Sequence, residues 1–264
     1  MLFRSLDGCF DVQVLSTGLA RLDDAIGGGL AKGRLYGLAA RTKGYKTTVM
    51  LTVAANLALR GVPVAWMAVE LGREKVGRRL WATMTGVRPA ELERREPQAV
   101  MAVHRWREQN GDPPIWIRDC GGAEWPEIVA AIEEMIEARR VRVVFLDYWQ
   151  IVAGGQGNRP AYLAEIAKGL AALAVTNKVA VVCAAQLHDD GRTCWGESLE
   201  QSADWFGTIQ LGLKVLRPDL SPVSVQQLWI KTKLHRDGDR IDAGSEADPA
   251  FVVDPRGPRI VEAL

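Results

Sequence analysis

The stretch LYGLAARTKGYKTTVMLTVAANLALR, residues 35–60, decides the fold. Its first part, 35–40, is apolar apart from one glycine and predicts a buried strand. Residues 46–60 are rich in helix formers and stop at Gly61, so they predict a helix. The loop between them, RTKGYKT, is polar. A buried strand joined to a helix by a short loop is the repeating unit of a parallel sheet.

The same alternation continues along the chain. Further strands are predicted at 62–70, 141–152 and 179–186, and further helices at 126–140 and 160–176. In the last helix Leu163, Ile166, Leu170 and Leu173 recur at spacings of three and four, which places them on one face. The pattern indicates an α/β protein, with a mostly parallel sheet covered by helices on both faces.

The pattern changes after about residue 205. Three stretches, 207–216, 223–233 and 250–254, predict strands joined by short polar loops, which we interpret as an antiparallel C-terminal extension of the sheet. Upstream, 72–113 is polar and predicted to be helical, with its mixed charges on a solvated face. No linker or repeat divides the chain. We therefore expect one domain over 14–264, preceded by an N-terminal arm at 1–13.

The composition excludes several classes of protein. The chain has 264 residues, 48% of them hydrophobic and 25% charged, and a formal net charge of +1. These values exclude a disordered chain and a uniformly basic nucleic-acid coat, although not a local basic groove. No segment is apolar over the length of a membrane span or resembles a signal peptide. Cys183 lies in an apolar run and no C-x-x-C pair occurs, so we expect no zinc site and a reducing, cytoplasmic location.

The polar loop after the first strand has features of a phosphate-binding loop. That motif reads G-x-x-x-x-G-K-[ST], and Lys46 and Thr47 occupy its last two positions at a helix start. Lys46 is expected to reach the β- and γ-phosphates of ATP, and Thr47 to bind Mg²⁺. Ala40 and Tyr45 replace the two glycines, and Gly44 is expected to supply the flexibility instead. The predicted nucleotide-binding residues are Arg41, Thr42, Lys43, Gly44, Tyr45, Lys46, Thr47 and Thr48.

Three further polar residues directly follow the apolar runs of predicted strands. Asp147 follows the apolar run VVFL and is expected to hold Mg²⁺ together with Thr47. Glu70 ends a strand expected beside the strand at 35–40, where it would activate an attacking water. Gln186 ends another strand and would sense the γ-phosphate. Ligands of open α/β sheets bind at the carboxyl ends of the strands, so these residues predict one site.

Taken in order, these blocks resemble RecA-type ATPases, and most closely the C-terminal motor domain of DnaB-type replicative helicases. The resemblance runs from about residue 14 to residue 260. Its blocks are STGLARLDDAIGGGLAKGRLYGLAA (16–40), AVELGREKVGRR (68–79), LDYWQIV (146–152), NRPAYLAEIAKGLAALA (158–174), VAVVCAAQL (179–187) and ESLEQSADW (197–205). The first block equally resembles KaiC- and RadA-like proteins, whereas the D-Y-x-Q, EI-xxx-L-xx-LA and AQL patterns favour DnaB. The family's catalytic glutamate falls on Glu70 and its Walker B aspartate on Asp147.

The resemblance also implies residues that act between subunits. The segment KTKLHRDGD (231–239) resembles the family's K-x-R-x-G stretch, in which a Lys and an Arg reach the γ-phosphate held by a neighbouring subunit. Lys233 and Arg236 match best, although they lie one residue further apart than usual; Lys231 with Lys233 is the alternative pairing. The family implies a homo-oligomeric ring, a hexamer, working with replication or recombination proteins. No separate N-terminal domain is recognised, so a primase-binding collar is not expected.

Two loops are expected to face single-stranded DNA. In RecA-type motors the corresponding loops line a central channel, and here they are AGGQGNRP (153–160) and LHDDGRTCWGES (187–198). Asn158 and Arg159 in the first loop, and Arg192 in the second, are the candidate phosphate contacts. Trp195 is a candidate for stacking on a base.

Three functions remain open on the sequence alone. The first is an ATP-driven helicase or translocase of the DnaB type, acting on single-stranded DNA in replication. The second is a weakly hydrolysing or non-hydrolysing accessory protein that binds nucleotide or DNA and loads or recruits another factor; Tyr45 in the phosphate loop favours it. The third is a KaiC- or RadA-like ATPase of repair or regulation.

Overall fold

The computed structural model describes residues 13–188, 190–192, 198–216, 223–254 and 258–263. Nearly all of the predicted N-terminal arm, 1–13, therefore lies outside the described residues. The strands of the main sheet are β3 (Leu35–Ala40), β4 (Val64–Ala68), β5 (Ile115–Asp119), β6 (Val143–Asp147), β7 (Ala180–Gln186), β8 (Trp205–Leu216), β9 (Val223–His235), β10 (Phe251–Val253) and β11 (Ile260–Glu262). A separate two-stranded sheet pairs β1 (Val14–Leu15) with β2 (Leu30–Ala31).

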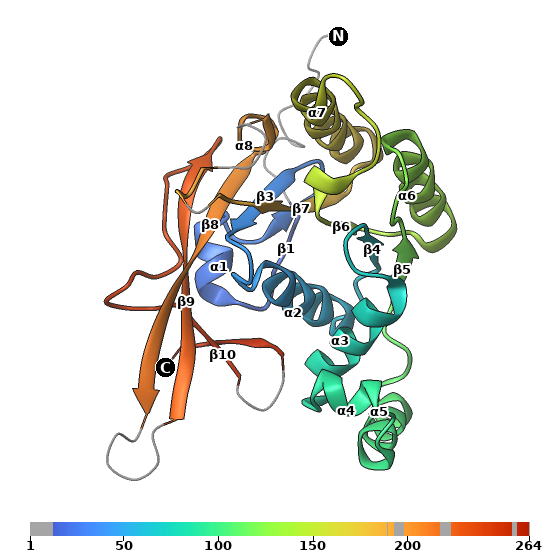
Figure 1. The fold of residues 1–264 in the computed structure, drawn as a ribbon, viewed down its shortest axis with the longest axis vertical. Coiled ribbons are helices and arrows are strands. Elements are labelled where there is room, and N and C mark those ends of the chain that lie inside the picture. The colour runs from blue at the N-terminus through green and yellow to red at the C-terminus, as the bar shows by residue number, and fades with distance from the viewer. Residues whose placement is uncertain (1–12, 189, 193–197, 217–222, 255–257, 264) are drawn as a thin grey trace.

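The main sheet has the strand order β11-β10-β9-β8-β3-β7-β6-β4-β5 (Figure 1). The six strands from β8 to β5 in this order are parallel, whereas β8, β9, β10 and β11 pair antiparallel. The structure therefore confirms the α/β class and the antiparallel C-terminal extension. Every residue of β3 is buried, because this strand lies inside the sheet and is covered on both faces.

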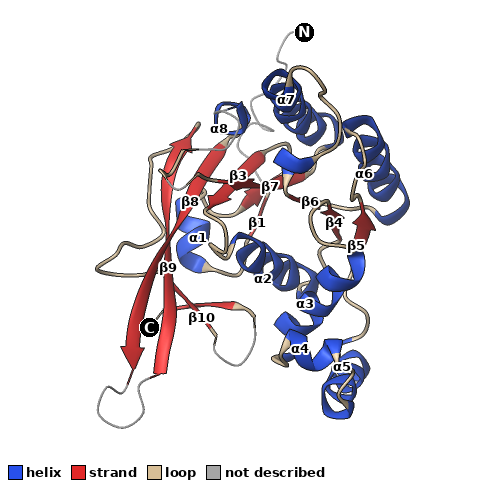
Figure 2. Ribbon diagram, viewed as in Figure 1, coloured by secondary structure: helices blue, strands red, loops and turns tan. Residues whose placement is uncertain are grey.

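Helices cover both faces of the sheet (Figure 2). The helices are α1 (Ala20–Ala25), α2 (Lys46–Leu59), α3 (Arg73–Thr85), α4 (Pro89–Glu93), α5 (Pro97–Asn110), α6 (Trp125–Arg139), α7 (Arg159–Asn177) and α8 (Ser198–Ser202). Residues of α1, α2 and α3 share one hydrophobic core with one face of the sheet. Residues of α6, α7 and α8 form a second core on the opposite face. Within the described part of the chain, no helix is long and apolar enough to span a bilayer.

Several predicted bounds need correction. The strand predicted at 141–152 ends at Asp147, and Trp149–Ile151 forms a 3-10 turn that buries Trp149 and Gln150. The edge strand β5 was missed, because it is only half-buried and follows two prolines in a polar segment. The helical prediction for 72–113 is confirmed by α3, α4 and α5.

The sequence also predicted the wrong neighbour for the phosphate-loop strand. The strand before Glu70, β4, was expected to lie beside β3, but β7 and β6 lie between them. β4 itself ends at Ala68, so Glu70 lies in the bend after the strand. Fully buried parallel strands are apolar along their whole length, and such runs do not encode which strand is adjacent.

Candidate functional site

The loop between β3 and α2 is held in an unusual backbone conformation. Lys43 and Tyr45 both have a φ of 61°, in the left-handed region that normally favours glycine. Gly44, which was expected to provide the flexibility, does not occupy that region. It is required for close packing instead, since a Cβ there would lie 2.7 Å from the Arg41 carbonyl oxygen and 2.8 Å from the Ala40 Cβ. Tyr45 is the N-cap of α2 and caps no N–H group with its side chain.

Lys46 lies at the centre of a charged cluster. Its Nζ donates to Asp147 Oδ1 at 3.0 Å and to Glu70 Oε2 at 3.2 Å. The Thr47 hydroxyl donates to the other Asp147 oxygen, Oδ2, at 2.7 Å. Asp147 is 2% exposed, so its charge depends on these partners, whereas the Glu70 side chain is 43% exposed. The sequence prediction that these four residues meet is thus confirmed in space.

Tyr148 is a member of this cluster that the sequence prediction did not assign. The Lys46 ammonium lies 4.1 Å from the centroid of the Tyr148 ring, a cation–π distance. Lys46 therefore contacts the Tyr148 ring in addition to the two carboxylates. The main chain also links the two carboxylates, because the N–H of Glu70 donates to the Asp147 carbonyl at 3.1 Å.

Gln186 contacts the phosphate loop directly. Its Nε2 donates to the Thr42 hydroxyl at 2.9 Å, and β7 therefore ends against the loop that follows β3. The main chain of Gln186 is bound in turn by the side-chain amide of Gln150, through bonds of 3.0 and 3.1 Å. The predicted γ-phosphate sensor thus lies at the expected edge of the sheet.

A cleft of about 400 Å³ opens over these residues, within the usual ~300–1,000 Å³ of small-molecule sites. Its lining is formed by the whole loop Arg41–Thr48, together with Glu70, Leu71, Arg79 and Gln186. The sequence prediction missed Arg79, which was assigned with its neighbours to a solvated face. A signal was present: Val76, Leu80 and Thr83 are the buried stripe of α3, and Arg79 lies along that stripe.

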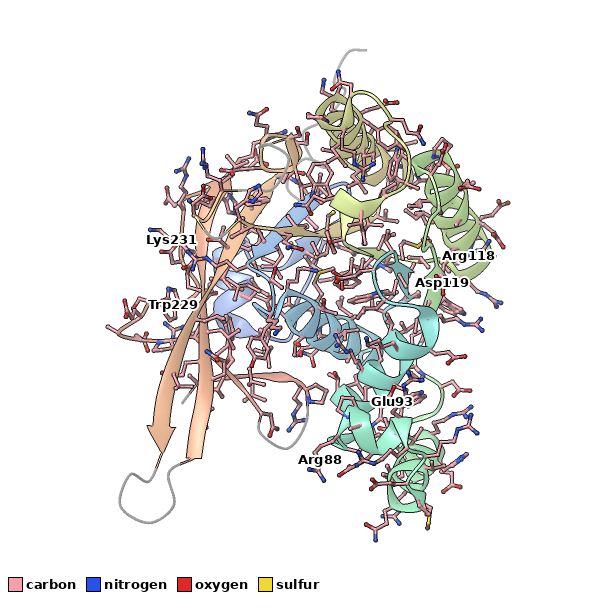
Figure 3. The ribbon with its side chains drawn as sticks, viewed as in Figure 1. Arg88, Glu93, Arg118, Asp119, Trp229 and Lys231 are labelled. Carbon is pink, nitrogen blue, oxygen red and sulfur yellow. The ribbon has the colours of Figure 1, made fainter. Side chains whose placement is uncertain are left out.

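The predicted intersubunit residues lie on β9. The strand predicted at 223–233 continues to His235 as β9, and Lys233 is an exposed residue of this strand. Arg236 follows the strand, and its guanidinium donates to the Gln201 carbonyl at 2.9 Å. A second cleft borders the phosphate loop at Arg41 and Gly44 and is lined on β9 by Trp229, Lys231 and Lys233. Figure 3 shows Trp229 and Lys231 along this strand.

The candidate DNA contacts are partly engaged within the chain. Asn158 is the N-cap of α7 and accepts from the N–H of Ala161 at 3.2 Å. Arg159 donates to the carbonyls of Gly154 and Gln150, at 2.6 and 2.7 Å. Arg192 is exposed and forms an ion pair with Asp190 at 2.7 Å. Trp195 lies outside the described residues, so its predicted stacking role stays a prediction.

The family follows from a comparison with known proteins. The family model described as the DnaB-like helicase C-terminal domain matches residues 14–193, which is more than half of the chain and includes the whole phosphate-loop cluster. The chain belongs to this family. Its DnaB-like character agrees with the resemblance read from the sequence, and the KaiC/RadA alternative is not favoured.

Individual relatives support the assignment of this chain to the DnaB-like family. The replicative DNA helicase DnaB of Treponema pallidum (strain Nichols) is 26% identical over 183 residues, which is 67% of this chain and 41% of that protein. The DnaB of Rhodothermus marinus is 30% identical over 193 residues, 69% of this chain and 20% of that protein. The chain thus spans less than half the length of these curated relatives.

Solved structures support the same fold. A structure described as an ATPase domain has a TM-score of 0.77 at 20% identity and covers 99% of both chains. A DnaB-like replicative helicase studied for its interactions with primase has a TM-score of 0.76 at 19% identity, covering 98% of this chain and 64% of its own. A KaiC-like protein from Pyrococcus horikoshii OT3 has a lower TM-score of 0.64 at 17% identity. The fold is therefore RecA-like.

Proposed function

We propose that this chain is the ATP-driven motor of a DnaB-type helicase that translocates on single-stranded DNA during replication. The observation that carries the proposal is the contact of Lys46 with Asp147 and Glu70 at the start of α2, in a chain of the DnaB-like family. The proposal includes a homo-oligomeric ring, a hexamer as the family resemblance implies, acting in the cytoplasm with other replication or recombination proteins.

The residues of the cleft fit a nucleoside triphosphate with Mg²⁺. Among the described residues no side chain caps the first N–H groups of α2, which leaves them and the helix dipole to receive phosphate oxygens. Thr47 and Asp147 offer the hard oxygen ligands that Mg²⁺ prefers, and they lie side by side. Bound there, Mg²⁺ would neutralise phosphate charge.

Each residue of the cluster has a distinct role in this proposal. Lys46 leaves its two carboxylates and binds the β- and γ-phosphates. Glu70 is then released from the lysine and serves as the base that takes a proton from the attacking water, while Gln186 senses the γ-phosphate. Lys233 and Arg236 supply the cations in trans, with Lys231 and Lys233 as the alternative pair. Loops 153–160 and 187–198 contact the DNA through Asn158, Arg159, Arg192 and Trp195.

ATP hydrolysis with and without single-stranded DNA tests the proposal. We expect magnesium-dependent turnover that increases when a poly-dT oligonucleotide is added. Nucleotide binding without turnover, with or without DNA, would contradict a motor and favour the accessory function to which Tyr45 points. If the protein binds no nucleotide at millimolar ATP, both the motor and the nucleotide-binding accessory function are contradicted.

A further inference from the structure

Gln150 lies between the nucleotide cleft and the loop of residues 153–158. It belongs to the 3-10 turn after β6 and is 5% exposed. Its side-chain Nε2 donates to the Gln186 carbonyl at 3.0 Å, and its Oε1 accepts from the Gln186 N–H at 3.1 Å. Both ends of one amide are thus bound to the main chain of one residue, and a displacement of Gln186 must break these bonds or move Gln150.

Further hydrogen bonds extend from Gln150 and Gln186, both toward the cleft and away from it. Toward the cleft, Gln186 Nε2 donates to the hydroxyl of Thr42 in the phosphate loop at 2.9 Å. Away from the cleft, the Arg159 guanidinium donates to the Gln150 carbonyl at 2.7 Å and to the Gly154 carbonyl at 2.6 Å. An unbroken series of hydrogen bonds therefore joins the phosphate loop to the 153–158 loop.

The 153–158 loop is also fixed from its other side. The Tyr162 hydroxyl of α7 donates to the Ala153 carbonyl at 2.9 Å. Gly154 and Gly155 have φ values of +104° and +72°, and a Cβ on either would lie 2.9 or 2.7 Å from Tyr162 atoms. The loop is therefore wrapped tightly around one side chain, and its base moves only together with Arg159 and Tyr162.

We propose that Gln150 is a positioning residue that couples occupancy of the nucleotide cleft to the conformation of the 153–158 loop. A phosphate bound in the cleft competes with Thr42 for the Gln186 amide. The resulting shift of the Gln186 main chain reaches Gln150 through its paired bonds, and Arg159 carries it to Gly154. Arg159 thus serves the loop as an internal clamp. The inference rests on the proposed binding of nucleotide in this cleft.

Hydrogen–deuterium exchange resolved by peptide tests the coupling without DNA or hydrolysis. Exchange is measured with and without ATPγS and Mg²⁺ in the wild type, in Gln150→Glu and in Gln150→Met. Gln150→Glu keeps the shape but turns the donor into an acceptor facing a carbonyl, and Gln150→Met removes both bonds at similar volume. Gln109→Glu is the matched control, since Gln109 is an exposed residue of α5 remote from the cleft.

In the wild type and in Gln109→Glu, we expect ATPγS to slow exchange both in 41–48 and in 152–159. The slowing in 152–159 should reach about fivefold, the lower end of typical coupling between two sites. In both Gln150 variants the slowing in 41–48 should persist, and that in 152–159 should fall below about twofold. A dT oligonucleotide titrated with and without ATPγS should lose its nucleotide dependence in the same variants.

The other outcomes are distinguishable. Slowing in 41–48 but not in 152–159 of the wild type, or equal slowing in wild type and variants, overturns the coupling and leaves nucleotide binding intact. Loss of slowing in both segments of both Gln150 variants would make Gln150 a requirement for binding and also overturns the coupling. No slowing in 41–48 of the wild type overturns the proposed function, and the coupling falls with it.

Discussion

The Lys46 ammonium and the Asp147 carboxylate lie 3.0 Å apart, although the two residues are 101 positions apart in the sequence. In this arrangement the cation of the phosphate loop is shared between a buried aspartate and the more exposed Glu70. The three side chains together carry one net negative charge. A triphosphate must therefore draw Lys46 away from Asp147, and Mg²⁺ can then replace the lysine as the partner of that carboxylate.

Lys46→Ala should abolish nucleotide binding and also lower the free energy of unfolding. The variant removes the phosphate cation and leaves Asp147 buried without its ion-pair partner, a loss that costs up to ~3–5 kcal/mol in buried pairs. A fluorescent ATP titration measures the first effect and thermal unfolding the second. Lys46→Ala/Asp147→Asn should recover most of the stability but no binding. If the double variant stays as unstable as the single one, the charge argument is wrong.

Glu70→Gln should keep the affinity for ATP and lose turnover. The amide retains the shape of the glutamate but cannot accept a proton, and removal of a general base usually costs ~10²–10⁴-fold in rate. Because the Glu70 side chain is 43% exposed, stability should change by less than about 1 kcal/mol. Glu74→Gln, an exposed residue of α3, is the control and should have wild-type turnover. Unchanged turnover in Glu70→Gln would move the base to another residue.

Tyr45→Gly and Tyr45→Ala together measure the strain of the phosphate loop. Both variants lose the packing of the tyrosine ring against the core. Only glycine, which has no Cβ, avoids the free-energy cost of a left-handed backbone at a φ of 61°. That penalty is roughly 1–2 kcal/mol. Tyr45→Gly should thus be more stable than Tyr45→Ala by about 1 kcal/mol in urea unfolding. Equal stability of the two variants would show that the left-handed conformation is not retained in solution.

Hydrolysis should need a cation from a neighbouring subunit. Lys233→Ala and Arg236→Ala should each lower turnover, since an arginine finger in related phosphoryl transfers contributes ~10³–10⁵-fold. Lys233 is exposed on β9, whereas Arg236 must first release the Gln201 carbonyl. Mixing either variant with Lys46→Ala should restore part of the activity, because some interfaces then join an intact phosphate loop to an intact finger.

The mixing experiment has a clear contrary result. A specific activity that is independent of protein concentration down to the monomer, with no recovery on mixing, would contradict both the finger in trans and the ring. Glu246→Gln mixed with Lys46→Ala is the control for subunit exchange, because Glu246 is exposed and remote from the cleft. In that mixture only the interfaces with an intact phosphate loop should hydrolyse ATP.

The elements that the sequence predicted best are those with an uninterrupted signal. β3 and α2 have nearly the predicted bounds, because an apolar run, a polar loop and a helix follow one another directly. The meeting of Lys46, Asp147 and Glu70 was also predictable, since the carboxyl ends of parallel strands share one edge of a sheet.

Other features depend on tertiary contacts that leave no local pattern. The insertion of β7 and β6 between β3 and β4 could not be predicted, since these strands are apolar apart from the last residue of β6 and of β7, and an apolar run does not encode its neighbour. The bonds of Arg159 to two carbonyls of its own chain were not predicted, because they depend on how the loop turns around Tyr162. The left-handed φ of Tyr45 did have a signal in the sequence, because Tyr45 replaces a glycine of the phosphate-loop motif, although tyrosine rarely adopts this conformation.

The position of β3 in the sheet has a consequence for synthesis on the ribosome. β3 ends at residue 40, while its two neighbours, β7 and β8, begin at residues 180 and 205. At about 5–20 residues per second, the 140 residues from 40 to 180 take about 7–28 s to emerge. Throughout that interval LYGLAA is an apolar strand with both edges open. The nascent chain should therefore need a holding chaperone until its second half is made.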